Sequence, residues 1–303
     1  MLLAETLRLL DCRPGETVVD LTAGRGGHSV ALARTVGPGG VVIGFDLDPE
    51  SLAFAERRVQ EAGGRFEPVG DSFLRAPQHL ADAGLRADAV LADLGFSSRQ
   101  MDDPRRGFGF SVDGPLDMRY DPRNPLSAEK LLATFGEDEL ALIIRRYGED
   151  PYARKIARKL ALARQHEPIR STAQLAELVR EAYGPRAHRS RVHPATRTFM
   201  ALRIAVNDEM TALNALLEHL RRAAEGAREG AGWLRPGARV AIISFHSLED
   251  RPVKRAFAAL ADDGLATQLT KRPLTPGPQE IADNPRSRSA KLRAVRLSGQ
   301  NSS

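Results

Sequence analysis

The chain has 303 residues, of which 42% are hydrophobic and 27% charged, with one cysteine and a formal net charge of +5. This is the composition of a globular protein with a large core, and it excludes an internal disulfide framework and a multi-cysteine metal site. No run approaches the ~20 apolar residues of a membrane span, and the N-terminal segment lacks signal-peptide features, so we expect a cytoplasmic protein with no membrane partner.

The first hundred residues alternate short apolar runs with helical patterns. The apolar runs, most of which end in acidic residues, lie at 17–21, 40–48, 65–70 and 87–95. Buried strands that alternate with helices predict an α/β fold with a parallel sheet. The same kind of pattern returns late in the chain, where it predicts strands at 238–247, near 266–270 and at 291–297, with a helix at about 249–262.

The middle of the chain interrupts this alternation. The gap between the strands at 87–95 and 238–247 is too long for one crossover connection. A loop rich in glycine, proline and aspartate opens it, and Ser171 with Gln174 resembles a capping box at the start of a helix. Helices are expected at 137–147, 151–165, 172–182 and 197–222. We interpret this region as an inserted helical domain, which divides the chain into 1–104, 105–206 and 207–303.

A glycine-rich stretch, DLTAGRGGHS, follows the first predicted strand directly. Glycines clustered in this way mark a tight turn or a close approach of the backbone to a ligand. Asp20, Asp46 and Asp93 each stand at the end of a predicted strand. Because ligands bind beyond the carboxyl ends of parallel strands, we expect the three acids and the turn to converge on one crevice.

Two cofactor classes compete for this crevice. In the dinucleotide pattern G-x-G-x-x-G, counted from Gly24, Ser29 stands where the third glycine belongs, and Asp20 would face a pyrophosphate. S-adenosylmethionine has two cationic groups and no phosphate, so an acidic crevice suits it better. Asp46 can accept hydrogen bonds from the ribose of either cofactor. The residues favour the methyl donor, with an NAD-dependent oxidoreductase as the alternative.

Several longer motifs carry a family resemblance. The segments DLTAGRGGHS, GFDLDPESL, DLGFSSRQMDDPRRGFGF, HPATRTFMALRIAVNDE, ISFHSLEDRPVK and NPRSRSAKLR resemble those of the bacterial 16S rRNA cytosine-N4 methyltransferases, over about 2–297. The resemblance implies a class I (Rossmann-like) S-adenosylmethionine-dependent methyltransferase core with an inserted helical substrate-recognition domain. It also implies methylation of the N4 amine of a cytidine in the decoding centre (P site) of the small ribosomal subunit.

By motif position, the resemblance also implies a set of cofactor contacts. These fall on Gly26, Gly27, His28, Asp46, Phe73 beside the adenine, Asp93 and Gln100. The sequence departs from the family pattern at two places. Members carry His-x-Pro-Val just before two leucines, where this chain reads Met1-Leu2-Leu3, and Arg99 stands where proline is usual.

The chemistry of amine methylation points to a hydrogen-bond acceptor at the reacting nitrogen. The cytosine amine is a poor nucleophile because its lone pair is delocalised into the ring, so the enzyme must orient it and accept its protons. We interpret Asp93 as this catalytic acceptor; a purely cofactor-binding Asp93, a nearby backbone carbonyl, Asp117 and Ser97 are the alternatives. His246 either faces the crevice or binds Glu249 or Asp250 at a helix start.

The basic residues indicate a nucleic-acid partner. They gather in 182–207, in the helix predicted at 151–165, and from Lys271 to the end of the chain. We expect them to contact phosphates of 16S rRNA. Phe108 and Phe110 either stack on an extruded base or cap the core, and His193 is expected at a helix entry. No metal site is predicted, because the histidines show no ligand spacing. A non-catalytic RNA-binding protein with this fold is the remaining alternative.

Overall fold

The computed structural model describes residues 1–95, 98–189 and 193–299 and divides into two compact units. The first unit combines Met1–Gly95 with Met210–Ser303, and the second is Phe96–Glu209. The insert expected at 105–206 falls within the second unit. In the described part of the chain, no helix is long and apolar enough to cross a membrane.

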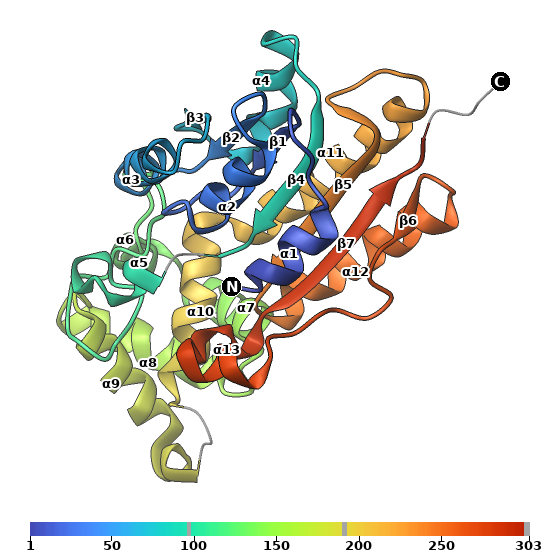
Figure 1. Cartoon of the computed structure of the whole chain (residues 1–303). Helices are drawn as coiled ribbons and strands as arrows, with labels where there is room; N and C mark the ends of the chain where they lie inside the picture. Colours follow the sequence, from blue (N-terminus) through green and yellow to red (C-terminus); the bar gives the residue numbers. More distant parts are fainter. Residues whose placement is uncertain (96–97, 190–192, 300–303) are drawn as a thin grey trace. The chain divides into compact units, whose positions relative to one another are not determined.

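The first unit is a sheet covered by helices (Figure 1). Its strands are β1 (Thr17–Asp20), β2 (Val41–Phe45), β3 (Phe66–Val69), β4 (Ala87–Asp93), β5 (Leu234–Ser244), β6 (Ala266–Gln268) and β7 (Lys291–Leu297). Its helices are α1 (Leu3–Leu10), α2 (Gly27–Val36), α3 (Pro49–Glu61), η1 (Phe73–Arg75), α4 (Ala76–Asp82), α11 (Glu209–Arg228, from Met210 on), α12 (Ser247–Asp262), α13 (Pro278–Asp283) and η4 (Pro285–Ser289).

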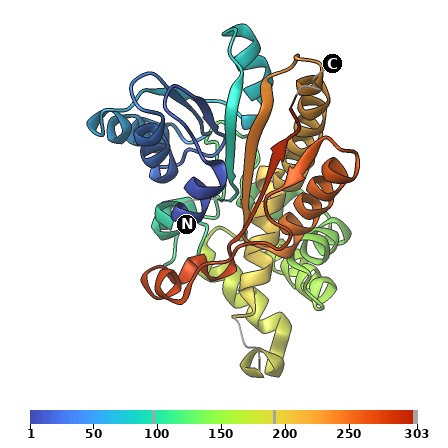
Figure 2. The ribbon, with the colours of Figure 1, turned by 45° about the vertical axis from the view of Figure 1, so that its right-hand side comes forward.

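The seven strands have the order β3-β2-β1-β4-β5-β7-β6. The first five run parallel in the Rossmann order 3-2-1-4-5, and β7 lies antiparallel between β5 and β6. Figure 2 shows β7 between these two strands, with α12 beside them. The inserted antiparallel strand distinguishes the class I methyltransferase core from the dinucleotide-binding fold, so the expected fold class is confirmed.

Both faces of this sheet are buried, which explains the continuous apolar runs of its strands. Successive residues alternate between the faces. Val19 and Val90 join the cluster under α11 and α12, whereas Val18 and Ala89 join the cluster under α1 and α2. The carboxyl ends of β1, β2 and β4 are thereby fixed side by side at one edge of a rigid sheet.

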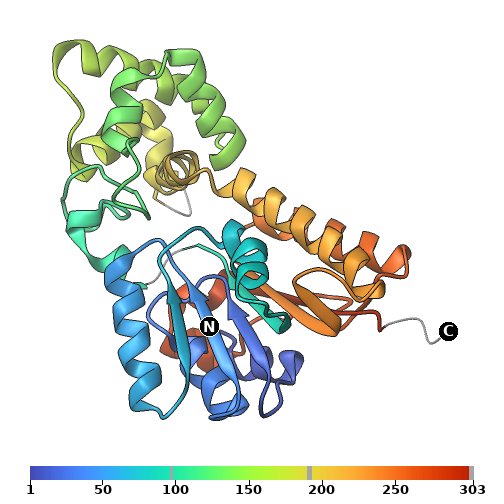
Figure 3. The same cartoon turned by 90° about the horizontal axis from the view of Figure 1, so that it is seen from above.

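The second unit is helical (Figure 3). Its elements are α5 (Ser98–Asp102), η2 (Pro104–Arg106), α6 (Ala128–Thr134), α7 (Glu137–Gly148), α8 (Ala153–His166), α9 (Thr172–Tyr183), η3 (Gly184–Arg189) and α10 (Ala195–Asn207). At the start of α9, Ser171 Oγ accepts from Gln174 N at 3.2 Å, as in a capping box. The Gln174 side chain, however, accepts from Arg170 N instead of closing the box.

The prediction of a single helix at 197–222 is wrong. The chain forms α10 and α11 instead, with Asp208 between them in the left-handed region at a φ of 48°. Asn207 explains the break, because its side chain donates to Met118 O at 2.7 Å and accepts from Tyr120 N at 2.7 Å. Both partners are distant in sequence, so local helical periodicity carries no sign of them.

Candidate active site

The glycine-rich turn connects β1 to α2 at the carboxyl edge of the sheet. Gly24 and Gly26 have φ values of +50° and +75°, a region that side chains rarely adopt. Gly24 N donates to Asp46 Oδ2 at 2.7 Å, which ties the turn to the end of β2. A Cβ added to Gly26 would lie 3.0 Å from Ala55 of α3, whereas one added to Gly27 would meet nothing within 4 Å. The turn is thus packed on one side and open on the other.

Helix α3 holds this turn through contacts that carry no recognisable sequence signal. The guanidinium carbon of Arg25 lies 3.5 Å from the ring centroid of Phe54. Arg58 Nη1 donates to the carbonyl oxygen of Arg25 at 3.0 Å. Together with the packing of Gly26 on Ala55, these contacts fix the path of the backbone between β1 and α2.

Asp20 supports the turn from within. Its carboxylate is 1% exposed, and it accepts from Thr22 N at 3.2 Å and from Ser29 Oγ at 2.6 Å. Burial raises the pKa of Asp20 to about 6, and the charge of Asp46 adds to this rise. Asp20 therefore fastens the turn to α2, and its oxygens are occupied by protein donors.

Asp46 stands at the end of β2. Its two oxygens accept from Gly24 N at 2.7 Å and from Asp48 N at 2.8 Å. Burial raises the pKa of this carboxyl group, against the effect of these hydrogen bonds. Each carboxylate oxygen has a second lone pair, so Asp46 can still accept from a ligand hydroxyl.

Asp93 ends β4 and has a strongly perturbed carboxyl group. Its backbone N–H donates to Thr22 Oγ1 at 2.6 Å, and its Oδ1 is buried with no hydrogen-bond partner among the described residues. Burial raises the pKa of Asp93 to about 7; the charges of Asp20 and Glu249 add to the rise, and the N-terminal ammonium group opposes it. Its side chain is 21% exposed. An orphaned acceptor that is easily protonated is the feature expected of a binding or catalytic carboxyl group.

His28 faces Asp93 from the first turn of α2. Its Nδ1 lies 3.6 Å from Asp93 Oδ2, and its Nε2 lies 3.0 Å from the carbonyl oxygen of Met1. Burial, with the nearby N-terminal ammonium group, lowers the pKa of His28 to about 4. A neutral ring that donates from Nε2 to Met1 presents the Nδ1 lone pair to Asp93. Because an ionised Asp93 would then face another acceptor, this tautomer agrees with its raised pKa.

His246 is the N-terminal cap of α12. Its Nδ1 accepts from Glu249 N at 3.3 Å, and its Nε2 lies 3.2 Å from Glu249 Oε1. Glu249 Oε2 in turn accepts from Phe245 N at 2.7 Å. Of the two interpretations drawn from the sequence, the structure shows the capping contact with Glu249 at the start of α12.

The remaining candidate residues stand on other elements. Phe73, in η1, packs half-buried against the core of the first unit, and Gln100, in α5, belongs to the second unit. Asp117 also belongs to the second unit, where it accepts two hydrogen bonds, of 3.0 and 2.7 Å, from the Arg119 guanidinium and a third from the Arg119 backbone N–H. Burial would raise the pKa of Asp117, but the contacts with Arg119 outweigh it and lower that pKa, which disfavours Asp117 as a proton acceptor. Ser97 lies outside the described residues.

The two phenylalanines proposed for base stacking are packed within the second unit. Phe108 is 5% exposed and stacks on Tyr120 at 5.6 Å, so the core-capping interpretation holds for it. Phe110 is partly buried, and its ring centroid lies 4.6 Å from that of His193 and 4.9 Å from that of Phe199. His193 Nδ1 accepts from the N–H of Ala195, which is the helix-entry role expected of it.

The carboxylates and the open turn of the first unit suit an adenosyl cofactor that carries positive charge. Asp20, Asp46 and Asp93 lie close enough for the charge of Asp46 to act on Asp20, and that of Asp20 on Asp93. The orphaned Oδ1 of Asp93 calls for a donor, and the open side of Gly27 leaves room beside it. Ser29 is 0% exposed and bound to Asp20, at the position where the dinucleotide pattern has a glycine for close packing of helix on strand. Thr22, which joins the turn to β4, had no signal of its own in the sequence.

Comparison with known proteins shows the family. A model of the MraW methylase family matches residues 1–298. Three bacterial relatives named ribosomal RNA small subunit methyltransferase H align over nearly their whole length. The one from Solidesulfovibrio magneticus is 45% identical over 97% of this chain and 94% of its own, and that from Acidobacterium capsulatum is 44% identical over 97% and 96%. The one from Trichlorobacter lovleyi is 43% identical over 99% and 97%. The chain therefore belongs to the MraW methylase family of methyltransferases.

Proposed function

We propose that this protein transfers the methyl group of S-adenosylmethionine to the N4 amine of a cytidine in the decoding centre of 16S rRNA. The observation that carries the proposal is the buried, partnerless Oδ1 of Asp93 beside the glycine turn. The relatives named as methyltransferases of small-subunit rRNA support the substrate class. Such a substrate implies that the protein acts in the cytoplasm, and we assign recognition of the RNA to the helical insert at 105–206.

The residues of the first unit divide the binding of the cofactor among them. The backbone of Gly26 and Gly27, next to His28, would receive the methionine part on the open side of the turn. Asp46 would accept from the ribose hydroxyls, and Phe73 would lie against the adenine. Gln100 stays a proposed contact from the segment after β4. S-adenosylmethionine supplies a methyl group on a positively charged sulfur, which leaves as a neutral thioether when a nucleophile takes the methyl group.

Asp93 would act on the amine through its protonation state. In the free protein its raised pKa keeps much of it protonated at neutral pH. The ammonium group of the cofactor would favour the ionised form of Asp93. The ionised carboxylate would then also accept a hydrogen bond from the amine and hold the cytosine nitrogen in line. As the new N–C bond forms and the C–S bond breaks, the nitrogen becomes acidic, and the Asp93 carboxylate takes the released proton.

A product analysis tests this proposal. Purified protein is incubated with methyl-labelled S-adenosylmethionine and small-subunit RNA, or whole subunits, from cells that lack the modification. We expect labelled N4-methylcytidine after nuclease digestion, and a loss of at least tenfold in rate for Asp93→Asn. The matched control, Asp82→Asn on the exposed side of α4, should keep the wild-type rate. Label on a ring carbon or on a ribose hydroxyl would refute the N4 assignment, and no label on either substrate would refute the function.

A further inference from the structure

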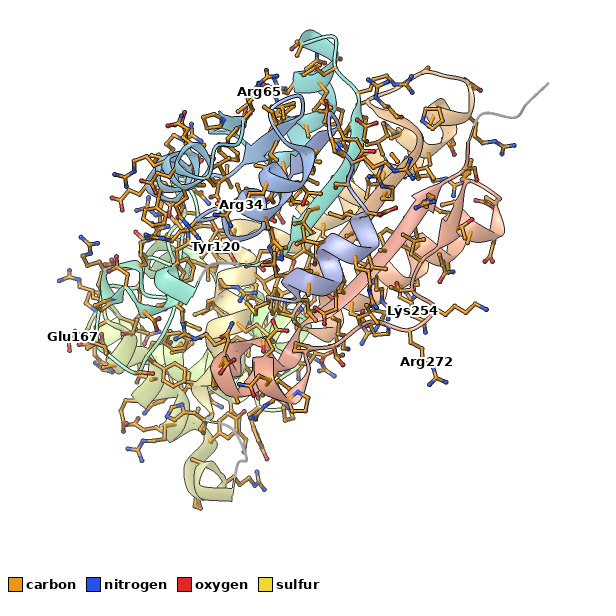
Figure 4. The ribbon with its side chains drawn as sticks, in the orientation of Figure 1. Arg34, Arg65, Tyr120, Glu167, Lys254 and Arg272 are labelled. Atoms are coloured by element: carbon orange, nitrogen blue, oxygen red, sulfur yellow. The ribbon has the colours of Figure 1, made fainter. Side chains whose placement is uncertain are left out.

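The exposed basic residues around α12 form a surface that the site described above does not use. The α12 patch consists of Arg251, Lys254, Arg255, Lys271 and Arg272, all of which are exposed. The first three are spaced at i, i+3 and i+4 on α12, so they share one side of the helix. The last two follow β6 in the chain. Figure 4 shows Lys254 and Arg272 extending outward from the ribbon of the first unit.

Strand register places Lys271 and Arg272 of this patch towards the same edge of the sheet as the cofactor site. β7 is antiparallel to both β5 and β6, so β6 runs in the direction of β5. Beyond β6, Leu274 pairs with Leu292, which itself pairs with Ile243 near the carboxyl end of β5. Lys271 and Arg272 therefore lie towards the carboxyl edge, where α12 begins and where β4 ends in Asp93.

The acidic residues of α12 do not pair with Lys254 or Arg255. Asp250 is bound by Arg293 at 2.7 Å and by Lys291 at 3.5 Å, and its side chain is 13% exposed. Glu249 is buried against Phe245 and His246. The next acid, Asp262, lies eight residues beyond Lys254, about 12 Å further along the helix. Among the described residues, no ion pair involves Lys254, Arg255, Lys271 or Arg272.

The same contacts divide the basic tail that the sequence analysis treated as one cluster. Arg293 is 6% exposed and is held by Asp250, so it is a structural residue. Lys291 shares that carboxylate. Lys271 and Arg272 remain exposed beside α12 and are available to an external anion.

We infer that the α12 patch binds phosphates of the RNA strand next to the target cytidine. This inference rests on the proposed function and adds a second contact surface to it, on the methyltransferase core. An RNA that presents a base at the carboxyl edge must carry its flanking phosphates across the neighbouring surface. The exposed cations of Lys254, Arg255, Lys271 and Arg272 there supply sequence-independent affinity and orientation.

A matched pair of charge reversals tests the inference. The patch variant is Lys254→Glu with Arg272→Glu. The control variant is Arg34→Glu with Arg65→Glu, which changes the net charge by the same amount. Arg34 and Arg65 are also exposed, but they lie near the amino ends of β1 and β2, at the end of α2 and just before β3 (Figure 4). Binding of a small-subunit RNA fragment is measured against salt concentration for both variants and the wild type.

We expect the patch variant to bind the RNA about tenfold more weakly than the wild type at low salt. The slope of log K against log salt should fall by about 1.4 to 1.8, the value for two lost phosphate contacts. Melting temperature and S-adenosylmethionine affinity should be unchanged. The control variant should keep most of the wild-type slope.

Equal losses in the patch and control variants would overturn the inference, because net charge alone would then explain them. A loss seen with assembled subunits but not with free RNA would also overturn it, in favour of a ribosomal protein as the partner. If the wild type binds and methylates small-subunit RNA while the patch variant behaves like the wild type, the inference fails and the proposed function stands.

Discussion

Replacing Asp93 by asparagine keeps the shape of the side chain and removes its ionisation, and its effects should depend on pH. The folded pKa of about 7 lies above the ordinary unfolded value of about 3.9. A raised pKa means that the native state binds the proton more tightly, so the stabilisation is complete below pH ~4 and is lost as pH rises through ~7. Between pH 5 and pH 8 this loss should lower the unfolding free energy of the free protein by roughly 2 to 3 kcal/mol.

The same titration should control cofactor binding in the opposite direction. The ionised carboxylate is the form that accepts from a cationic ligand, so affinity should fall about tenfold from pH 8 to pH 6. In Asp93→Asn the charge-assisted hydrogen bond, about 1.5–3 kcal/mol, is absent, and affinity at pH 8 should fall by about 10- to 150-fold. Because asparagine does not ionise, the affinity of the variant should no longer show the change of about tenfold between pH 6 and pH 8.

Calorimetric titration with S-adenosylmethionine and chemical unfolding, both at pH 5 to 8, measure the two effects. Asp20, His28 and the ligand also titrate in this range, so the difference between the curves of wild type and variant reports Asp93 together with its coupling to Asp20. Asp82→Asn serves as the control and should follow the wild type. An Asp93→Asn protein with wild-type affinity at pH 8 and an unchanged stability difference between pH 5 and pH 8 would refute this assignment.

Three further substitutions test the fold of the two units. Gly26→Ala places an alanine in the left-handed region and brings its Cβ within 3.0 Å of Ala55. We expect the variant to be about 1–3 kcal/mol less stable and to bind the cofactor more weakly. Wild-type affinity by calorimetry would count against the packed turn. Arg239→Met removes the partner of Glu16 and the donor to three backbone carbonyls; urea unfolding should show a loss of about 3–5 kcal/mol, and a loss below 1 would contradict the buried network. Asp208→Gly relieves a left-handed φ of 48°; a gain of about 0.5–1 kcal/mol is expected by the same method, and a net loss would show that the Asp208 side chain contributes to the break.

Much of the core fold could be predicted from its strands. Apolar runs such as TVVD and ADAVLAD are buried on both faces, so their whole length signals a strand, and the acids that follow them mark the carboxyl edge. The start of β5 is harder to place, because the first residue of Leu234–Ser244, a buried leucine, is followed by an exposed arginine, a proline and a glycine before the apolar part begins. Helix α6 was missed because seven residues are too few for a helical period to show.

The site could be predicted only in part, because the position of an acid does not reveal its partners. Asp20 and Asp93 both follow strands, yet Asp20 turns inward to Ser29, whereas Asp93 keeps an unpartnered oxygen. The break at Asp208 depends on contacts of Asn207 with residues almost ninety positions away. Likewise, Arg203 looks like a surface cation in the sequence, but it is bound by Glu209 with both side chains largely buried. Such long-range pairings leave no local pattern.

The most direct test of the cofactor assignment is a parallel calorimetric titration of the wild-type protein with S-adenosylmethionine and with NAD at pH 8. We predict one molecule of S-adenosylmethionine bound per chain and no heat of binding from NAD. Binding of NAD, or no binding of S-adenosylmethionine, would contradict the central claim that these carboxylates and this open turn receive a cationic methyl donor.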